Sequence, residues 1–255
     1  MALFKVVLIY CDITVLFYAH VTVFCTVVVG YNLIKYVAMW SQKKRFAYRN
    51  AIVALTLGCM VLFLLLFINE QPLAWALFML IAALSLVYTV PLFHKQGLRY
   101  FPVVKLFIVA ISWVLLLLFY PVLTVYNDQA SVSAVAVFEI PFIELRAAQL
   151  VLFVLALCIP FEIRDLKYDE ITLRTLPQLV GIKTAKIIGL LLLLHIPLLE
   201  FLEENTSTFL GVEVLVIITI TGMAIWFSDQ FKTDYYASFF VEAIPVLWLF
   251  LLWFK

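Results

Sequence analysis

Three acidic residues in the second half of the chain fall on one face of a predicted helix. Glu162, Asp165 and Asp169 are spaced i, i+3 and i+7, which places three carboxylates on one stripe of a 3.6-residue helix. Three like charges in a row are unfavourable unless a cation lies against them. Mg²⁺ suits such a stripe, because it binds carboxylate oxygens and keeps positions open for a phosphate ligand. The alternative interpretation is an ordinary charged, solvated helix end.

Basic residues lie within this stripe and after it in the sequence. They are Arg164, Lys167, Arg174, Lys183 and Lys186. Carboxylates together with clustered bases are the composition expected of a site that binds a metal ion and a diphosphate.

A second segment that could do chemistry runs from Tyr88 to Pro91 and is followed by Arg99 and Lys105. Pro91 is expected to end a helix where that helix leaves the membrane. Lys105 lies about one turn inside the next apolar segment, where a cation is unfavourable unless it is paired. Lys105 therefore either binds a phosphate group or extends its ammonium group to the membrane surface.

A third polar pair, Asn32 and Lys35, lies at the end of the first long apolar segment. The i, i+3 spacing puts both side chains on one helix face. Taken alone, the pair fits an interfacial position as well as it fits a binding site.

The composition determines the environment of these residues. The 255-residue chain is 66% hydrophobic and 13% charged, whereas soluble domains average about 45–50% and about 25%. A soluble globular protein and a disordered chain are therefore excluded. The net charge of +1 gives no indication of nucleic-acid binding. Unbroken apolar runs such as Val61–Ile68 argue against the alternation of a membrane β-barrel.

The sequence therefore predicts an all-α polytopic transmembrane bundle, folded as a single membrane domain over residues 1–255. A span needs about 20 apolar residues, and about eight segments qualify. They are Val7–Tyr36, Ala51–Ile68, Leu73–Phe93, Val103–Tyr126, Ile143–Ile163, Ala185–Phe201, Phe209–Phe227 and Tyr236–Phe254. The first is the least regular, and Asp12 is a candidate for its outer end, which would leave Met1–Cys11 as a separate stub. The four cysteines lie in apolar runs without CxxC spacing and are predicted to be apolar helix residues.

The basic residues give an orientation. All of the 17 basic residues except Lys5, Arg146 and Lys255 fall on one set of alternate links. By the positive-inside rule this side faces the cytoplasm, and the carboxylate stripe lies on the same side. The predicted location is the plasma (inner) membrane of a bacterium, with the candidate site near the cytoplasmic face.

Isolated polar residues within the apolar segments allow a different function. They are His20, Gln149, His195, Glu213 and Glu242. Ionisable groups inside a membrane are functional candidates, and an ion-coupled transporter would need them. Hydrogen bonds between neighbouring helices are the alternative explanation.

The stripe and its flanking residues resemble the UbiA superfamily of intramembrane prenyltransferases. The segment from Glu162 to Asp169, followed by Arg174-Thr175-Leu176-Pro177 and Gly181, is similar to the second aspartate motif of that family. Tyr88-Thr89-x-Pro91, Lys105 and Trp113 look like the family's Tyr-Ser-x-Pro segment and the lysine that follows it.

The resemblance implies a nine-helix bundle around a central cavity. Mg²⁺ and a prenyl diphosphate would be held near the cytoplasmic side, with Asp165, Asp169 and Glu162 at the metal. The diphosphate would contact Lys35, Arg99, Lys105, Arg164 and Arg174, with Asn32 and Tyr88 nearby. The implied activity is transfer of a prenyl group to an aromatic or other acceptor.

The chain departs from the family in two respects. The family's first motif reads Asn-Asp-x-x-Asp-x-x-x-Asp, but with Asn32 aligned its aspartate positions hold Leu33, Tyr36 and Trp40. One of two metal sites is therefore expected to be missing, with Lys35 replacing part of its charge. The family's first helix is expected to be missing or reduced to Met1–Cys11, so that a coding segment upstream of Met1 would restore it.

Three functions remain open from the sequence. The first is a divergent prenyltransferase that acts on a prenyl diphosphate in the lipid bilayer. The second is a catalytically inactive UbiA-like protein that binds an isoprenoid or serves as a membrane partner. The third is an unrelated transporter, for which Glu242 and His195 would line a pore and Asp165 would be dispensable.

Overall fold

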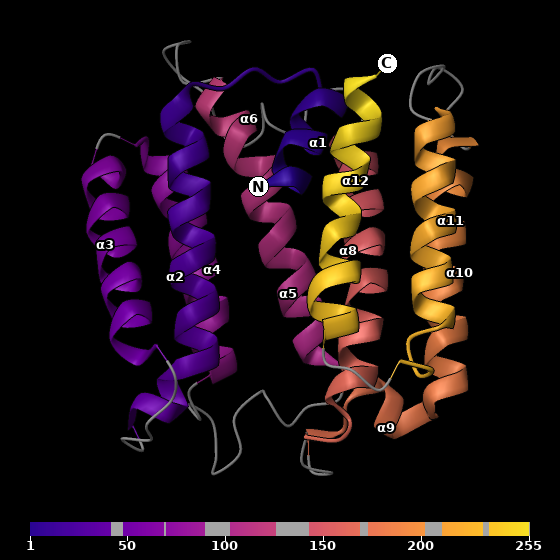
Figure 1. Ribbon diagram of the computed structural model, residues 1–255. Helices are drawn as coiled ribbons and strands as arrows, with labels where there is room; N and C mark the ends of the chain where they lie inside the picture. Colours follow the sequence, from indigo (N-terminus) through magenta and orange to yellow (C-terminus); the bar gives the residue numbers. More distant parts are fainter. Residues whose placement is uncertain are drawn as a thin grey trace.

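Helices lying side by side make up all the regular structure in the part of the chain that is described (Figure 1). The computed structural model describes residues 1–41, 48–68, 70–89, 103–125, 143–168, 173–201, 211–231 and 235–254. The prediction of an all-helical chain is confirmed over these ranges.

The helices follow one another in the order in which the apolar segments occur. They are α1 (Ala2–Tyr10), α2 (Phe17–Ser41), α3 (Arg49–Phe67), α4 (Pro72–Thr89), α5 (Val104–Val114), the π-helical turn η2 (Leu115–Phe119), α6 (Tyr120–Val125), α8 (Ile143–Asp165), α9 (Leu176–Val180), α10 (Ile182–Phe201), α11 (Val212–Trp226), the π-helical turn η5 (Tyr236–Val241) and α12 (Glu242–Trp253).

Several of these helices have the length and composition of membrane spans. Five described stretches are long and apolar enough to cross a bilayer: Arg49–Phe67, Val104–Val125, Ile143–Asp165, Ile182–Glu200 and Tyr236–Trp253. Three more apolar stretches are shorter: Phe17–Leu33, Pro72–Val87 and Val212–Trp226. Each of the eight predicted segments overlaps one of these stretches.

The first predicted segment is divided at Asp12. It was given as Val7 to Tyr36, with Asp12 as a candidate for its outer end, and in the structure α1 ends at Tyr10 and α2 begins at Phe17. The backbone of Asp12 has a φ of 51°, in the left-handed region that does not continue an α-helix. Met1–Cys11 is therefore separate from the long helix, as the position of Asp12 indicated.

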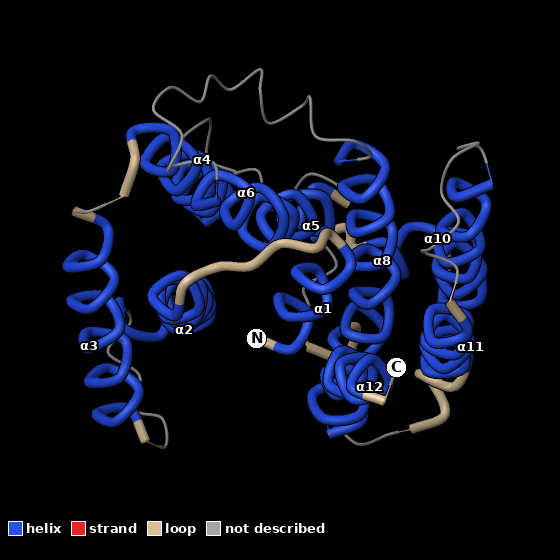
Figure 2. Tube along the Cα trace, turned by 90° about the horizontal axis from the view of Figure 1, so that it is seen from above, coloured by secondary structure: helices blue, strands red, loops and turns tan. Residues whose placement is uncertain are grey.

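Helix α1 lies in the interior of the bundle. Seen end-on, α1 is surrounded by α2, α5, α8 and α12 (Figure 2). Its side chains Phe4 and Val6 are almost completely buried, and it packs on α12 and η2. Nine residues at about 1.5 Å each extend for about 13 Å, less than half of a hydrocarbon core of about 30 Å. Helix α1 thus fills only one half of the bundle's depth.

A small residue allows three helices to approach closely. A Cβ atom added to Gly189 of α10 would lie 3.1 Å from Cδ1 of Ile225 on α11 and 3.2 Å from Cγ1 of Ile159 on α8. Lipid tails are as apolar as the side chains of a membrane helix, so the hydrophobic effect does not drive such helices together. Their association depends instead on close van der Waals packing of this kind. Helix α8, which carries the carboxylate stripe, is held in place partly by this contact.

The two ends of the bundle differ. We call the end where α8 finishes at Asp165 and α9 lies the α9 end; it is at the bottom of Figure 1. The other end, where α8 starts at Ile143 and α10 finishes, is the opposite end. Described basic residues at the α9 end include Lys105, Arg164 and Arg174, and the two ends hold separate polar clusters.

A buried carboxyl group joins the α3–α4 link to α6. The Tyr120 hydroxyl donates a 2.6 Å hydrogen bond to Oε1 of Glu70, and both residues are buried. Burial raises the pKa of the Glu70 carboxyl above its usual value, while the Tyr120 hydrogen bond acts in the opposite direction. The net rise means that the folded protein binds this proton more tightly than the unfolded chain does.

Replacing Glu70 with glutamine should remove a pH-dependent loss of stability. Because the folded-state pKa is raised, the wild-type protein should lose stability as the pH rises from the unfolded pKa of about 4.3 through the folded pKa. The glutamine side chain keeps an oxygen that accepts from Tyr120, and it cannot ionise. The measurement is the thermal midpoint of wild type and Glu70→Gln in detergent between pH 4 and 7. Equal pH slopes for the two proteins would contradict the prediction.

Candidate functional site

The last turns of α8 position the candidate site. Helix α8 runs without interruption through Pro160 to Asp165, so Glu162 and Asp165 remain one turn apart on the same stripe, as predicted. Their surroundings differ, because the Glu162 side chain is 3% exposed and that of Asp165 is 25% exposed. Asp169, the third member of the stripe, lies outside the described residues.

Glu162 is paired with Lys105 across two helices. The Lys105 ammonium nitrogen, in the first turn of α5, lies 2.7 Å from Oε1 of Glu162. A buried charge needs a partner of this kind. The Lys105 side chain is 37% exposed, so this ion pair has one buried and one accessible member. The structure thus joins two segments that the sequence presented 57 positions apart.

Contacts with Asp165, Ser238 and Phe161 hold Arg164 beside the same helix end. Its Nε donates to Oδ1 of Asp165 at 2.6 Å, and its Nη1 donates to Oγ of Ser238 on η5, also at 2.6 Å. The guanidinium group also lies over the Phe161 ring, 5.2 Å from the ring centroid. Both described carboxylates of the stripe therefore have basic counter-ions from the protein.

This pairing bears on the expected metal. In the described ranges there is no group of three or more His, Cys, Asp or Glu side chains that could hold a metal ion. Glu162 and Asp165 already bind Lys105 and Arg164, so the described carboxylates do not form a metal site without exchanging partners. The Mg²⁺ site stays a prediction, because it includes Asp169.

The segment after the stripe forms a sharp turn and a short helix. Arg174 is exposed, with a φ of 48°, and it directly precedes Thr175, the N-cap of α9. The backbone N–H of Thr175 donates to Oε1 of Gln178 at 2.9 Å. Pro177 lies in the first turn of α9, where a missing N–H is tolerated. Gly181, with a φ of 81°, links α9 to α10 in a conformation that favours glycine.

Asn32 has a partner away from the stripe. Its Nδ2 donates to the Thr56 hydroxyl of α3 at 2.9 Å, and that hydroxyl donates to the carbonyl of Ile52 at 2.7 Å. Asn32 is buried and thereby joins α2 to α3. Lys35 and Tyr88 lie on α2 and α4, but their side chains are outside the described part, and so is Arg99.

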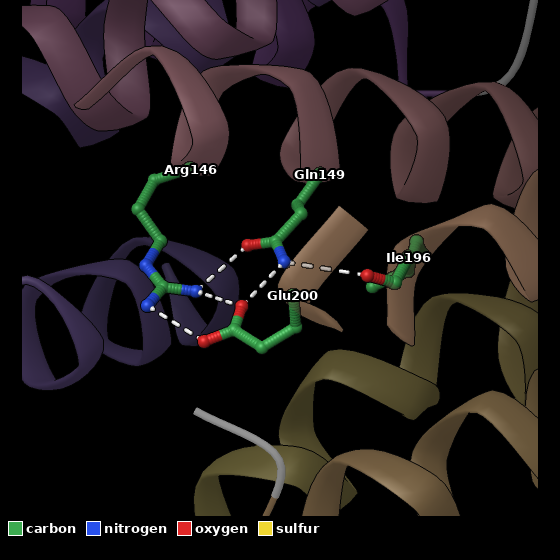
Figure 3. A network of polar contacts seen from close by, with 4 residues as sticks. All are labelled: Arg146, Gln149, Ile196 and Glu200. Carbon is green, nitrogen blue, oxygen red and sulfur yellow. Dashed lines mark hydrogen bonds and ion pairs between the residues drawn. The ribbon is translucent and has the colours of Figure 1, made fainter. Parts of the chain in front are cut away.

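A second polar cluster at the opposite end was missed by the sequence analysis. Nη1 of Arg146 donates to Oε1 of Gln149 and to Oε2 of Glu200, both at 2.8 Å, and Nη2 donates to Oε1 of Glu200 at 3.3 Å. Gln149 Nε2 donates to Oε2 of Glu200 at 2.8 Å and to the Ile196 carbonyl at 3.3 Å (Figure 3). The network is buried between α8 and α10, and Gln149 is therefore not an isolated polar residue.

The signal for this network was present but incomplete. Arg146 and Gln149 lie at i and i+3 on α8, which puts them on one face. Their acidic partner lies 51 residues beyond Gln149, and no local pattern connects them. Glu213 likewise has a distant partner, because the Tyr10 hydroxyl of α1 donates to its Oε1 at 3.3 Å.

The residues expected to line a transporter pore have a different environment. His195 is exposed, and its Nδ1 contacts the carbonyl of Leu191 on its own helix at 2.7 Å. Glu242 is exposed in the first turn of α12. Glu242 directly follows η5, so it lies near the α9 end rather than in the middle of the bundle.

A cavity of about 50 Å³ lies beside the second network, between α1, α8, α11 and α12. Its wall includes Val7, Leu150, Phe153 and Trp248. One water molecule needs about 10–15 Å³ of such cavity volume. The cavity therefore has room for a few water molecules. It is far below the size of an ordinary ligand pocket.

Comparison with known proteins adds no further constraint. No family model matches the sequence, and no curated protein or solved structure matches the chain. A functional assignment therefore depends on the geometry of the two clusters and on the sequence motifs.

Removing Glu200 alone should destabilise the protein more than removing the whole ion pair. Glu200→Leu leaves the Arg146 guanidinium buried without its carboxylate, which typically lowers the free energy of unfolding by about 3–5 kcal/mol. Arg146→Met combined with Glu200→Leu removes both charges and should recover most of that loss. The measurement is chemical unfolding in detergent, with Arg49→Met, an exposed base at the start of α3, as control. Additive losses in the double variant would contradict the prediction.

Proposed function

We propose that this chain is a UbiA-like intramembrane protein that binds a prenyl diphosphate at the α9 end and acts as a divergent prenyltransferase. The contact between Lys105 and Glu162 at 2.7 Å carries the proposal. The resemblance assigned these two residues to one site from separate motifs, and they come from different helices. Their meeting supports a shared site.

The proposal includes a membrane arrangement. The eight predicted segments would each cross the bilayer as spans of a UbiA-like fold. The α9 end would face the cytoplasm, because the basic links gather there. Large apolar side chains such as Leu57, Val61 and Leu65 of α3 are exposed, as expected of a surface that contacts lipid. The bacterial inner membrane is the proposed location.

The described bases would bind the diphosphate. The Lys105 ammonium group is partly exposed and acts as a point charge, whereas Arg164 presents a planar fork that matches phosphate oxygens. Arg174 is exposed beyond the stripe and would contact the outer phosphate. When the carbon–oxygen bond to diphosphate breaks, negative charge grows on the leaving group, and bases already in place stabilise that charge. Lys35 and Arg99 would add to this charge.

Glu162 and Asp165 would set the position of these bases. Glu162 is the buried member of its pair, so it anchors the Lys105 ammonium group at the end of α5. Asp165 does the same for Arg164. Mg²⁺ at Asp165, Asp169 and Glu162 remains part of the proposal, and its role is tested below by varying its concentration.

Binding without turnover is the second candidate function. It is favoured by the same two ion pairs, because carboxylates neutralised by Lys105 and Arg164 are less available to a metal ion. A protein with this arrangement would hold an isoprenoid without activating its leaving group. Turnover distinguishes the two candidates.

Neutralising Lys105 should weaken prenyl diphosphate binding. We expect Lys105→Gln to raise the Kd for tritiated farnesyl diphosphate about tenfold, since one charged hydrogen bond is worth about 1.5–3 kcal/mol and tenfold is about 1.4 kcal/mol. Asp165→Asn and Asp169→Asn should also weaken binding, and more so in the presence of Mg²⁺. The assay uses purified protein in detergent, with and without Mg²⁺ and candidate acceptors.

Arg49→Gln is the matched control, because Arg49 is an exposed base at the α9 end but is not a member of the proposed site. Its affinity should equal that of the wild type. Product formation would support the prenyltransferase, and binding without product would support the second candidate. Binding that none of the site variants alters would overturn both and leave the transporter.

A further inference from the structure

The last membrane helix contributes a side chain to the α9 end that the sequence motifs do not include. Ser238 lies in the π-helical turn η5, which begins the stretch Tyr236–Trp253 and packs beside the end of α8. Its Oγ accepts a 2.6 Å hydrogen bond from Nη1 of Arg164. This contact joins residues 74 positions apart.

The backbone around Ser238 is fixed by contacts on both sides of the turn. The Tyr236 ring stacks on Phe231 with centroids 4.4 Å apart, and its hydroxyl donates to the Ala224 carbonyl at 2.9 Å. Ala237 and Val241 are buried. A π-helical turn adds one residue to the helical repeat and changes the direction of the side chains that follow, and such turns are frequent at functional sites. Here the turn directs Ser238 towards α8.

Arg164 takes orienting contacts from its own helix and from η5. Its Nε donates to Asp165, the next residue of α8, and Phe161 supports the face of the guanidinium group. The hydrogen bond from Nη1 to Ser238 adds a second contact in the plane of the guanidinium group, from a different helix.

The hydroxyl group suits this role because it carries no charge. A carboxylate at this position would add a second negative charge to that of Asp165 beside Arg164. Serine accepts one hydrogen bond and adds no negative charge that would repel an anion. An arginine that is held in place before an anion binds loses less side-chain entropy on binding.

We propose that Ser238 is a positioning residue that holds the Arg164 guanidinium ready to receive a phosphate group at the junction of α8 and η5. This inference rests on the proposed diphosphate-binding function for its ligand. The orientation of Arg164 by Ser238 does not depend on that ligand, because the hydrogen bond is present without it.

Two readouts test the proposal on the full chain in detergent. The first is the Kd for tritiated farnesyl diphosphate. The second, made without ligand, is the rate at which phenylglyoxal modifies Arg164, measured by mass spectrometry of the peptide. The variants are Ser238→Ala and Ser238→Thr. The control is Thr219→Val on α11. Thr219 is exposed, and its hydroxyl donates a hydrogen bond to the Leu215 carbonyl of its own helix.

Ser238→Ala should weaken farnesyl diphosphate binding by about threefold to tenfold and should speed the modification of Arg164. Ser238→Thr keeps the hydroxyl and should restore both values, and Thr219→Val should leave both at the wild-type level. Equal thermal midpoints would show that the variants remain folded.

The outcomes separate this inference from the proposed function. If the wild type does not bind farnesyl diphosphate but Ser238→Ala speeds Arg164 modification, the proposed function is wrong and the positioning of Arg164 stands. If Ser238→Ala leaves the modification rate unchanged, the positioning role is overturned whatever the binding assay gives. A Ser238→Thr protein that behaves like Ser238→Ala would also overturn it.

Discussion

The Glu162 carboxylate is almost completely buried near the end of an apolar helix, and the Lys105 ammonium group lies 2.7 Å from it. A carboxylate without such a partner is unfavourable in this place. The pair therefore couples the register of α5 to that of α8, and Pro160 and Phe161 are placed with it. Arg164 and Asp165 are the last two residues of α8. Their positions at the α9 end therefore depend on the contact that fixes Glu162.

The same constraint explains the other charged contacts of the bundle. Arg146 and Glu200 pair at the opposite end, and Lys186 pairs with Asp229 while donating to the Trp226 carbonyl at 2.6 Å. Each pair joins two separate segments near a helix terminus, and the middle of the bundle is left to apolar packing such as that around Gly189. A charged side chain inside a membrane is costly unless it is paired. When its partner lies on another element, the pair also fixes the two helices relative to each other.

The helices were predictable and their partners were not. Apolar runs of sufficient length define α3, α8 and α10 directly, because the bilayer sets the required length. The start of α2 was left open, because Val7–Tyr36 is nearly continuous in apolar composition, and the break at Asp12 that the sequence suggested is present in the backbone. The stripe of Glu162 and Asp165 follows from helical periodicity. Glu200 and Ser238 were missed because each lies on a different helix from its partner, 54 and 74 positions away, and periodicity carries no information at that range.

The neutral pairing at the α9 end sets a condition for any anionic ligand. Lys105, Glu162, Arg164 and Asp165 carry no net charge together, so a diphosphate gains attraction only by taking bases away from carboxylates or by adding other bases. Glu162 is buried and would be left without a partner, so Lys105 must keep that contact while its exposed side meets the ligand. Asp165 is one-quarter exposed and can be solvated if a phosphate replaces it beside the Arg164 guanidinium. Arg164 is therefore the base that the ligand can engage at lower cost, and the uncharged hydroxyl of Ser238 can remain its partner through that exchange.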